Sequence, residues 1–256
     1  WSQKIPKNLE KFMRIFVLRE LVTGFKQRDC LETWGLVRVA YAGLEANEDL
    51  QKMAYKHGMS EEDLLNGIAS LLDSYRRGNI FYDEKEPIFT HYWAPGMPEI
   101  EQGYLPLFDF PPKGVKYIKE ADVKDSYVIS WSSVKGITRS RDFVSKCGIH
   151  PDKQLSLLKE MWEYLVSKRI LVPVTLAGPK GRPLPGANGV YQISSAHTGV
   201  LPQWIRYECN RCSRVHARPT PGMKCTNIHC KGTLREETPP EDDYNISLIG
   251  KDLVCT

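Results

Sequence analysis

The sequence lacks the patterns that mark membrane-spanning, secreted and nucleotide-hydrolysing proteins. No run approaches about 18 consecutive apolar residues and no charged, then apolar leader is present, so we expect neither a membrane span nor secretion. The Walker A pattern G-x4-G-K-[ST] is missing, as are the G-x-S-x-G, H-E-x-x-H and H-x-E patterns of hydrolases, zinc proteases and deaminases. We therefore predict no active site within this sequence.

A disulfide framework is also missing. Four of the seven cysteines cluster at metal-ligand spacing, while Cys30, Cys147 and Cys255 lie far apart. This distribution favours a reducing compartment, so we expect a cytoplasmic protein. With 41% hydrophobic and 26% charged residues, the composition is that of a folded globular chain with room for one large domain or several small ones.

Positive charge is concentrated in the middle of the chain. The net charge of +4 hides this, because residues 113–219 carry 18 Lys and Arg against 8 Asp and Glu, whereas residues 1–112 carry 13 against 17. A basic segment of this kind indicates contact with a polyanion such as nucleic acid. An ordinary solvated surface is the alternative.

Apolar periodicity predicts an α+β, mainly helical fold that starts with a helical region over 1–112. This region contains a helix over 9–27, a short strand near 37–41 and a helix that Ser60 caps, together with short strands. A stretch rich in proline and glycine ends the region and acts as a connector, so we place a domain boundary near its end.

Residues 113–205 follow the order of a winged-helix domain. A strand over 127–131 precedes a helix over 132–148, and Pro151 opens a further helix. Two β-rich runs then flank a loop rich in glycine and proline, which permits a long hairpin. The order helix, helix, strand, wing, strand predicts a winged helix, with a generic α+β subdomain as the alternative.

Residues 206–236 carry a predicted metal site. The spacing is C-x2-C, twelve residues, C-x4-C, and each pair can form a knuckle that presents two thiolates to one ion. Four thiolates leave no open position, so we expect structural Zn²⁺ in a small ribbon and no catalysis there. His216 and His229 are the alternative donors within the same stretch. The predicted ligands are Cys209, Cys212, Cys225 and Cys230.

Eight basic residues are predicted to bind nucleic acid on one continuous face. They lie on the helix over 132–148, on the wing and around the first cysteine pair, where they would neutralise phosphates. Glu160 and Glu163 occupy the outer side of the helix after Pro151, so we expect contact with the backbone and not base readout. The predicted contacts are Arg139, Arg141, Lys146, Lys180, Arg182, Arg206, Arg211 and Arg214.

Several stretches resemble prokaryotic superfamily 2 DEAD/DEAH-box helicases, including the antiphage-defence members of DISARM type. The order of the blocks is similar too, and the resemblance covers most of the chain. It rests on LRELVTGFKQRDCLETWGLVRVAYAGL at 18–44, the helix LLNGIASLLDSYRRGNIFYDE, the stretch ending in EMWEYLVSKRILVPV, and YECNRCSRVHARPTPGMKCTNIHCKGTL.

The resemblance implies an accessory region of a longer protein. Such helicases place a comparable winged helix and four-cysteine ribbon within the second half of the motor, so residues 237–256 would be a tail leading to a motor domain. ATP and Mg²⁺ would bind only the parent motor, and no catalytic residue is carried over to this chain. The implied partners are DNA or RNA, the motor lobes of the same polypeptide and subunits of a defence complex, with no membrane.

Two other functions remain open at this point. A winged helix with a zinc ribbon also suits a stand-alone transcription or chromatin factor. Alternatively, the acidic first region docks a partner protein, and zinc only stabilises the fold.

Overall fold

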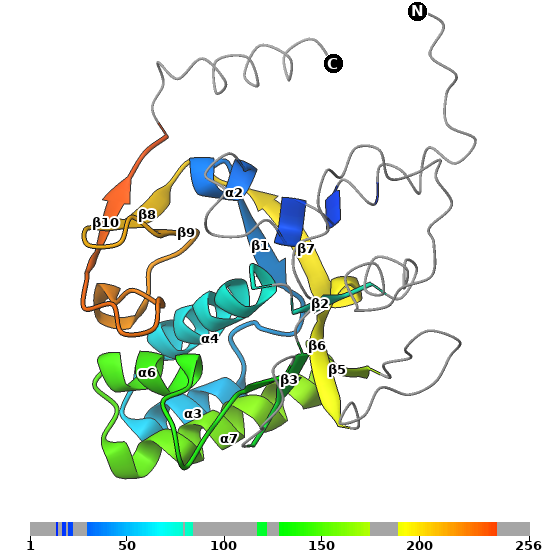
Figure 1. Ribbon diagram of the computed structural model, residues 1–256, viewed down its shortest axis with the longest axis vertical. Coiled ribbons are helices and arrows are strands. Elements are labelled where there is room, and N and C mark those ends of the chain that lie inside the picture. Colours follow the sequence, from blue (N-terminus) through cyan, green and yellow to red (C-terminus); the bar gives the residue numbers. More distant parts are fainter. Residues whose placement is uncertain are drawn as a thin grey trace, which may run out of the picture.

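The computed structural model is a mixed α/β structure in which helices pack beside small sheets (Figure 1). No helix in the described part of the chain is long and apolar enough to cross a membrane. The predicted wing, the boundary near residue 112 and nearly all of the predicted tail lie outside the described residues. The structure describes residues 30–78, 80–83, 117–121, 128–174 and 189–239, preceded by positions 14, 17, 18 and 20–22.

Helix boundaries follow the capping residues. Ser60 caps α4 (Glu61–Arg76) by accepting a hydrogen bond from the backbone N–H of Asp63, as predicted. Pro151 occupies the first turn of α7 (Pro151–Ser167), also as predicted. The other helices whose bounds lie within the described residues are α2 (Leu31–Trp34), α3 (Glu48–His57) and α6 (Arg139–Lys146), with the 3-10 turns η2 (Ser195–His197) and η3 (Pro221–Met223).

The helix expected over 132–148 is shorter than predicted, because α6 starts only at Arg139. Thr138 caps this helix by accepting a hydrogen bond from the backbone N–H of Arg141. Upstream, the Ser133 hydroxyl accepts hydrogen bonds from the backbone N–H groups of Lys135 and Gly136. Such a side chain offers the backbone an alternative to helical pairing, and residues 133–138 form a loop instead.

Strand β6 organises the largest sheet. It pairs antiparallel with β5, as the two β-rich runs around the wing predict. It also pairs antiparallel with β3 and parallel with β2. β4 extends the sheet beyond β3, β1 and β7 form a two-stranded sheet, and β10, β8 and β9 form a third. The strands are β1 (Val37–Tyr41), β2 (Phe81–Tyr82), β3 (Tyr117–Lys119), β4 (Val128–Ser130), β5 (Leu171–Val174), β6 (Val190–Ser194), β7 (Thr198–Pro202), β8 (Arg206–Cys209), β9 (Val215–His216) and β10 (Leu234–Glu237).

Elements on both sides of the predicted boundary share one core. Trp131 is fully buried within it, and its indole N–H donates to the carbonyl of Leu158 at 2.7 Å. The rings of Tyr75 and Trp162 lie 5.5 and 6.0 Å from that of Trp131. Because Tyr75 belongs to α4 and Trp162 to α7, these early and late helices pack as one unit.

Helix α3 covers one side of α7. Glu160 accepts a hydrogen bond from Lys56 at 2.7 Å and lies 3.3 Å from the Nε2 atom of His57. Tyr164 is buried, and its hydroxyl donates to the carbonyl of Gly43. Glu163 remains exposed as expected, whereas Glu160 faces α3. The side of α7 that includes Glu160 is therefore closed to a large ligand.

Candidate metal centre

The four predicted ligands meet at one end of the three-stranded sheet. Cys209 ends β8, Cys212 lies in the turn before β9, and Cys225 and Cys230 flank the turn between η3 and β10. The ligand atoms all lie within 4.8 Å of one another. The cluster could hold a metal ion, as the spacing predicts.

The sulfur separations fit a single tetrahedral ion. The Sγ atoms of Cys209 and Cys230 lie 3.7 Å apart, and those of Cys212 and Cys225 lie 3.6 Å apart. A disulfide would require about 2.05 Å. Metal–sulfur bonds of about 2.3 Å in a tetrahedron place the sulfurs about 3.8 Å apart. Each close pair joins one cysteine from each knuckle, so an ion at the centre would tie the two knuckles together.

Backbone N–H groups support the two sulfurs of the second knuckle. The N–H of Asn227 donates to Sγ of Cys225, and the N–H of Gly232 donates to Sγ of Cys230, both at 3.4 Å. Donors of this kind stabilise thiolate charge and orient the ligand toward a metal. The knuckle backbone thus prepares these sulfurs for coordination.

The environment also favours ionisation of one cysteine. Burial opposes the charged form of Cys212, but hydrogen bonds from the backbone of Arg214 and from Asn227, with the neighbouring thiols, lower the pKa of Cys212 to about 7. Burial, followed by the nearby thiols, raises the pKa of Cys225. A divalent ion would replace these protons, because thiolates and not thiols bind metal.

Neither predicted alternative donor belongs to the cluster. Among the described residues, the group of potential ligands consists of the four cysteines alone. Nε2 of His216 lies 3.6 Å from Sγ of Cys225. Burial and the positive charges of Arg214 and Arg77 lower the pKa of His216 to about 3, so this ring is neutral. His229 is exposed, and its backbone N–H donates to Asp142.

Gly232 allows the knuckles to approach each other. A methyl group at this position would lie 2.8 Å from Cβ of Arg211 and closer still to Sγ of Cys209. We expect Gly232→Ala to weaken metal binding by about tenfold or more, because overpacking of this kind costs about 1–3 kcal/mol. Competition with a chelating dye measures the affinity.

Gly199→Ala is the matched control for that substitution. No atom lies within 4 Å of a methyl group built at Gly199, and neither glycine has the positive φ that would strain an alanine. Equal metal affinities in the two variants would contradict the steric argument.

A buried charge network fixes the ribbon to the rest of the molecule. Asp73 of α4 accepts hydrogen bonds from Nε of Arg218 at 3.0 Å and from the hydroxyl of Tyr41 at 2.8 Å. Arg76, fully buried on the same helix, binds both carboxylate oxygens of Glu32 at 2.7 and 2.8 Å. Since Arg218 follows β9, one ion pair links the ribbon directly to α4.

Helix α6 holds the second knuckle. Nζ of Lys146 donates to the carbonyls of Cys225 at 3.2 Å and Asn227 at 2.7 Å. Asp142, one turn earlier, pairs with Lys146 at 2.5 Å and accepts from the backbone N–H of His229 at 3.3 Å.

Comparisons with protein-family models, curated proteins and solved structures gave no match. An inference about function therefore rests on the sequence resemblance and on the geometry of the chain itself.

Most of the described basic residues predicted to bind nucleic acid make contacts within the chain. Arg139 donates to the carbonyl of Ser74 at 2.6 Å, and Lys146 binds the second knuckle. Arg141 donates to the carbonyl of Ser133 at 2.8 Å. These three side chains stabilise the contacts of α6 with α4, the ribbon and the preceding loop.

The basic residues predicted around the ribbon differ in their contacts and in their exposure. Arg206 pairs with Glu237 at 2.9 Å, and Arg214 donates to Oδ1 of Asn227 at 3.2 Å. Arg211 is exposed and has no hydrogen-bond or ion-pair partner among the described residues. Lys180 and Arg182 lie outside the described residues. The structure therefore does not bring the described members together as one continuous exposed face.

Lys231 is a basic residue that the sequence prediction missed. It directly follows Cys230, is exposed, and has no partner among the described residues. The neighbouring Gly232 faces Arg211, and Thr233 accepts from the backbone N–H of Asn210 at 3.0 Å. Lys231 and Arg211 thus belong to adjoining segments, which we call the ribbon tip. The sequence feature that could have identified Lys231 as an exposed cation is its position directly after the predicted ligand Cys230 in a tight knuckle.

Proposed function

We propose that this chain is the accessory nucleic-acid-binding region of an ATP-dependent DEAD/DEAH-type helicase or translocase, acting in antiphage defence. The family assignment rests on the sequence resemblance. ATP and Mg²⁺ belong to motor lobes of the parent protein, and the region contacts the backbone of DNA or RNA. Strong discrimination between DNA sequences would instead favour a stand-alone transcription factor.

The occupant that we propose for the cysteine cluster is structural Zn²⁺. Four thiolates with near-tetrahedral spacing suit this ion, and a closed set of four protein ligands leaves no position for a substrate. The cysteines would hold the two knuckles in place, and the knuckles would position the ribbon tip. Metal and nucleic acid would therefore use adjoining parts of one small unit.

A winged helix is the proposed architecture of the central region. Its support is the element order β3, β4, α6, α7, β5, β6, in which β6 pairs antiparallel with both β3 and β5. Because α3 covers part of α7, insertion of α7 into a major groove is disfavoured. Backbone contact by the ribbon tip fits this arrangement better than base readout.

The ribbon tip is the observation that carries the nucleic-acid proposal, since Arg211 and Lys231 are exposed cations without partners among the described residues. We expect Arg211→Glu with Lys231→Glu to lower affinity for duplex DNA and to reduce the slope of log K against log salt by about 2, since each phosphate contact contributes about 0.9. Fluorescence anisotropy over a range of salt concentrations measures both effects.

Two exposed lysines that already pair with carboxylates provide a control with the same change in charge. Lys52 pairs with Glu48 and Lys159 with Glu163, and their side chains are 74% and 65% exposed. Reversing both to Glu should lower affinity less and leave the salt slope nearly unchanged. Equal slopes for the ribbon-tip variant and the unmodified protein would place the nucleic-acid surface elsewhere.

A further inference from the structure

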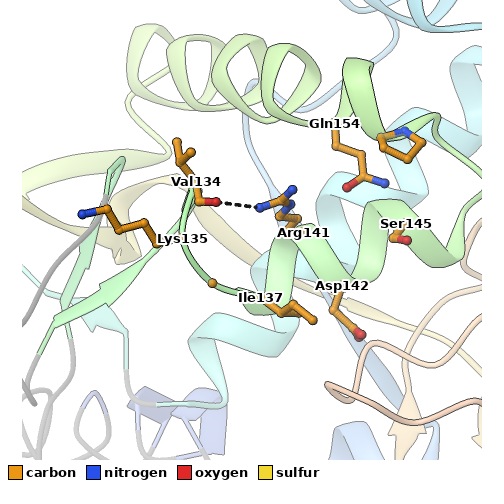
Figure 2. A pocket seen from close by; sticks show the side chains of 9 residues that line it. Val134, Lys135, Ile137, Arg141, Asp142, Ser145 and Gln154 are labelled. Carbon is orange, nitrogen blue, oxygen red and sulfur yellow. Dashed lines mark hydrogen bonds between the residues drawn. The ribbon is translucent and has the colours of Figure 1, made fainter.

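A groove of about 380 Å³ lies between the loop over 133–138, α6 and the start of α7 (Figure 2). It does not include the ribbon tip. Its lining combines exposed apolar side chains with a few polar groups, as in many sites that bind peptides or small molecules.

The apolar rim consists of Val134 and Ile137, whose exposed fractions are 74% and 62%. The loop that carries them is held in place, because Ser133 accepts two backbone hydrogen bonds and Arg141 donates to the carbonyls of Ser133 and Val134. Two large apolar side chains on a fixed loop cannot retreat into the core. Together with the groove, these two side chains offer an apolar surface to a partner.

The polar floor offers both an acceptor and a donor. Gln154 is only 5% exposed, and its Nε2 donates to the carbonyl of Ile149 at 3.0 Å. Its Oε1 has no hydrogen-bond partner among the described residues, and the side chain projects from α7 toward α6 in Figure 2. This oxygen is not fully enclosed by the chain, so a donor on a ligand in the groove could reach it. Arg141, on the facing helix, supplies the positive charge.

We propose that this groove docks an extended segment of a partner protein in which an apolar residue stands beside an acidic one. The apolar side chain lies between Val134 and Ile137, the carboxylate meets Arg141, and a backbone N–H of the segment donates to Oε1 of Gln154. Lys135, exposed on the loop between Val134 and Ile137, adds positive charge for the acidic neighbour. Apolar contact gives such a segment its affinity, and the charge selects it.

The groove suits a peptide better than a nucleic-acid strand. The Gln154 oxygen in its lining accepts hydrogen bonds and therefore suits a peptide N–H and not a phosphate oxygen, and the Asp142 carboxylate is already paired with Lys146. Exposed aliphatic side chains also provide no aromatic surface on which bases could stack. The inference therefore goes beyond nucleic-acid binding and does not depend on it.

The experiment uses the full chain labelled at valine and isoleucine methyl groups. The probe is a short synthetic peptide with one leucine between two aspartates, compared with a peptide containing asparagines in place of the aspartates and another containing serine in place of the leucine. We expect the first peptide to shift the NMR signals of the Val134 and Ile137 methyl groups and of the Gln154 amide. Each matched peptide should bind about tenfold more weakly.

Ile137→Ser should also weaken binding of the first peptide by about tenfold, without loss of the fold, because this side chain is already exposed. Tyr55→Ser, at an 89% exposed position on α3, is the control and should leave the affinity unchanged. The absence of shifts at the groove, or equal binding by the Ile137→Ser variant, overturns the proposal. So do shifts of the same methyl groups by a single-stranded oligonucleotide instead of the peptide. The ribbon-tip variant should retain peptide binding, which separates this result from that of the nucleic-acid proposal.

Discussion

Removal of the metal ion proposed for the cysteine cluster should unfold residues 206–237 while the core around α4 and α7 stays folded. The ribbon has little apolar core, since its buried cluster holds Tyr207 and Leu234 and otherwise cysteines. Metal affinity would therefore supply most of its folding free energy, as in zinc-finger peptides, where the binding free energy is roughly 10 kcal/mol or more. Hydrogen exchange before and after chelation should show loss of protection in the ribbon and retained protection in α4.

Cys209→Ser with Cys212→Ser should have the same effect as the chelator. Cys147→Ser is the control, because this thiol lies outside the cluster and burial, followed by the charge of Asp63, raises its pKa to about 12. The control should retain its metal. Equal thermal stability with and without a chelator that demonstrably strips the metal would show that the ribbon does not depend on it.

The second large effect is expected at Asp73. Asp73→Asn preserves the shape of the side chain and removes the charge that faces Arg218 and Arg76. Breaking a buried ion pair leaves an uncompensated charge, so we expect a loss of about 3–5 kcal/mol in the free energy of unfolding. Chemical denaturation measures this loss. Lys52→Ala, which removes an exposed pair with Glu48, should cost less than about 1 kcal/mol.

The contribution of the Asp73 carboxylate should also appear in how the free energy of unfolding depends on pH in acid. Burial would raise the pKa of Asp73, but attraction to Arg218 and Arg76 and the hydrogen bond from Tyr41 outweigh burial and lower it. A depressed pKa stabilises the fold above the unfolded value of about 3.9, and this contribution is lost as the pH falls through the folded value. Stability of the Asp73→Asn variant should thus depend less on pH below about 4. An unchanged acid dependence would exclude Asp73 as its source.

Features set by neighbouring residues were predictable from the sequence. The cysteine pairs carry their own geometry, because a knuckle needs only a few consecutive residues. Ser60 and Pro151 fix the starts of their helices through contacts within one turn. α3 was missed although Asn47 caps it and Gly58 ends it, because its apolar stripe is short and most of its surface is polar.

Features set by distant contacts could not be predicted in this way. Lys146 donates to the carbonyl of Asn227, which lies 81 positions later, and no local pattern distinguishes it from a solvent-facing lysine. Arg139 likewise finds its carbonyl partner on α4. The basic helix therefore looked like a phosphate-binding surface, whereas its charges hold together parts of the fold. Lys231 and Arg211 show the opposite case, in which exposure follows from the tight knuckles.

The pairing of Arg218 with Asp73 also limits how this ribbon can be exchanged. Because its four ligands lie within one short segment, the ribbon could be moved between proteins as a unit if metal binding alone held it in place. Transplanted elsewhere, this one would carry an arginine that needs a buried carboxylate in its new host. A foreign ribbon inserted here would leave Asp73 without one of its two arginine partners. Sequence changes at positions 73 and 218 should therefore be made together in a chimera, so that neither charge is left buried without its partner.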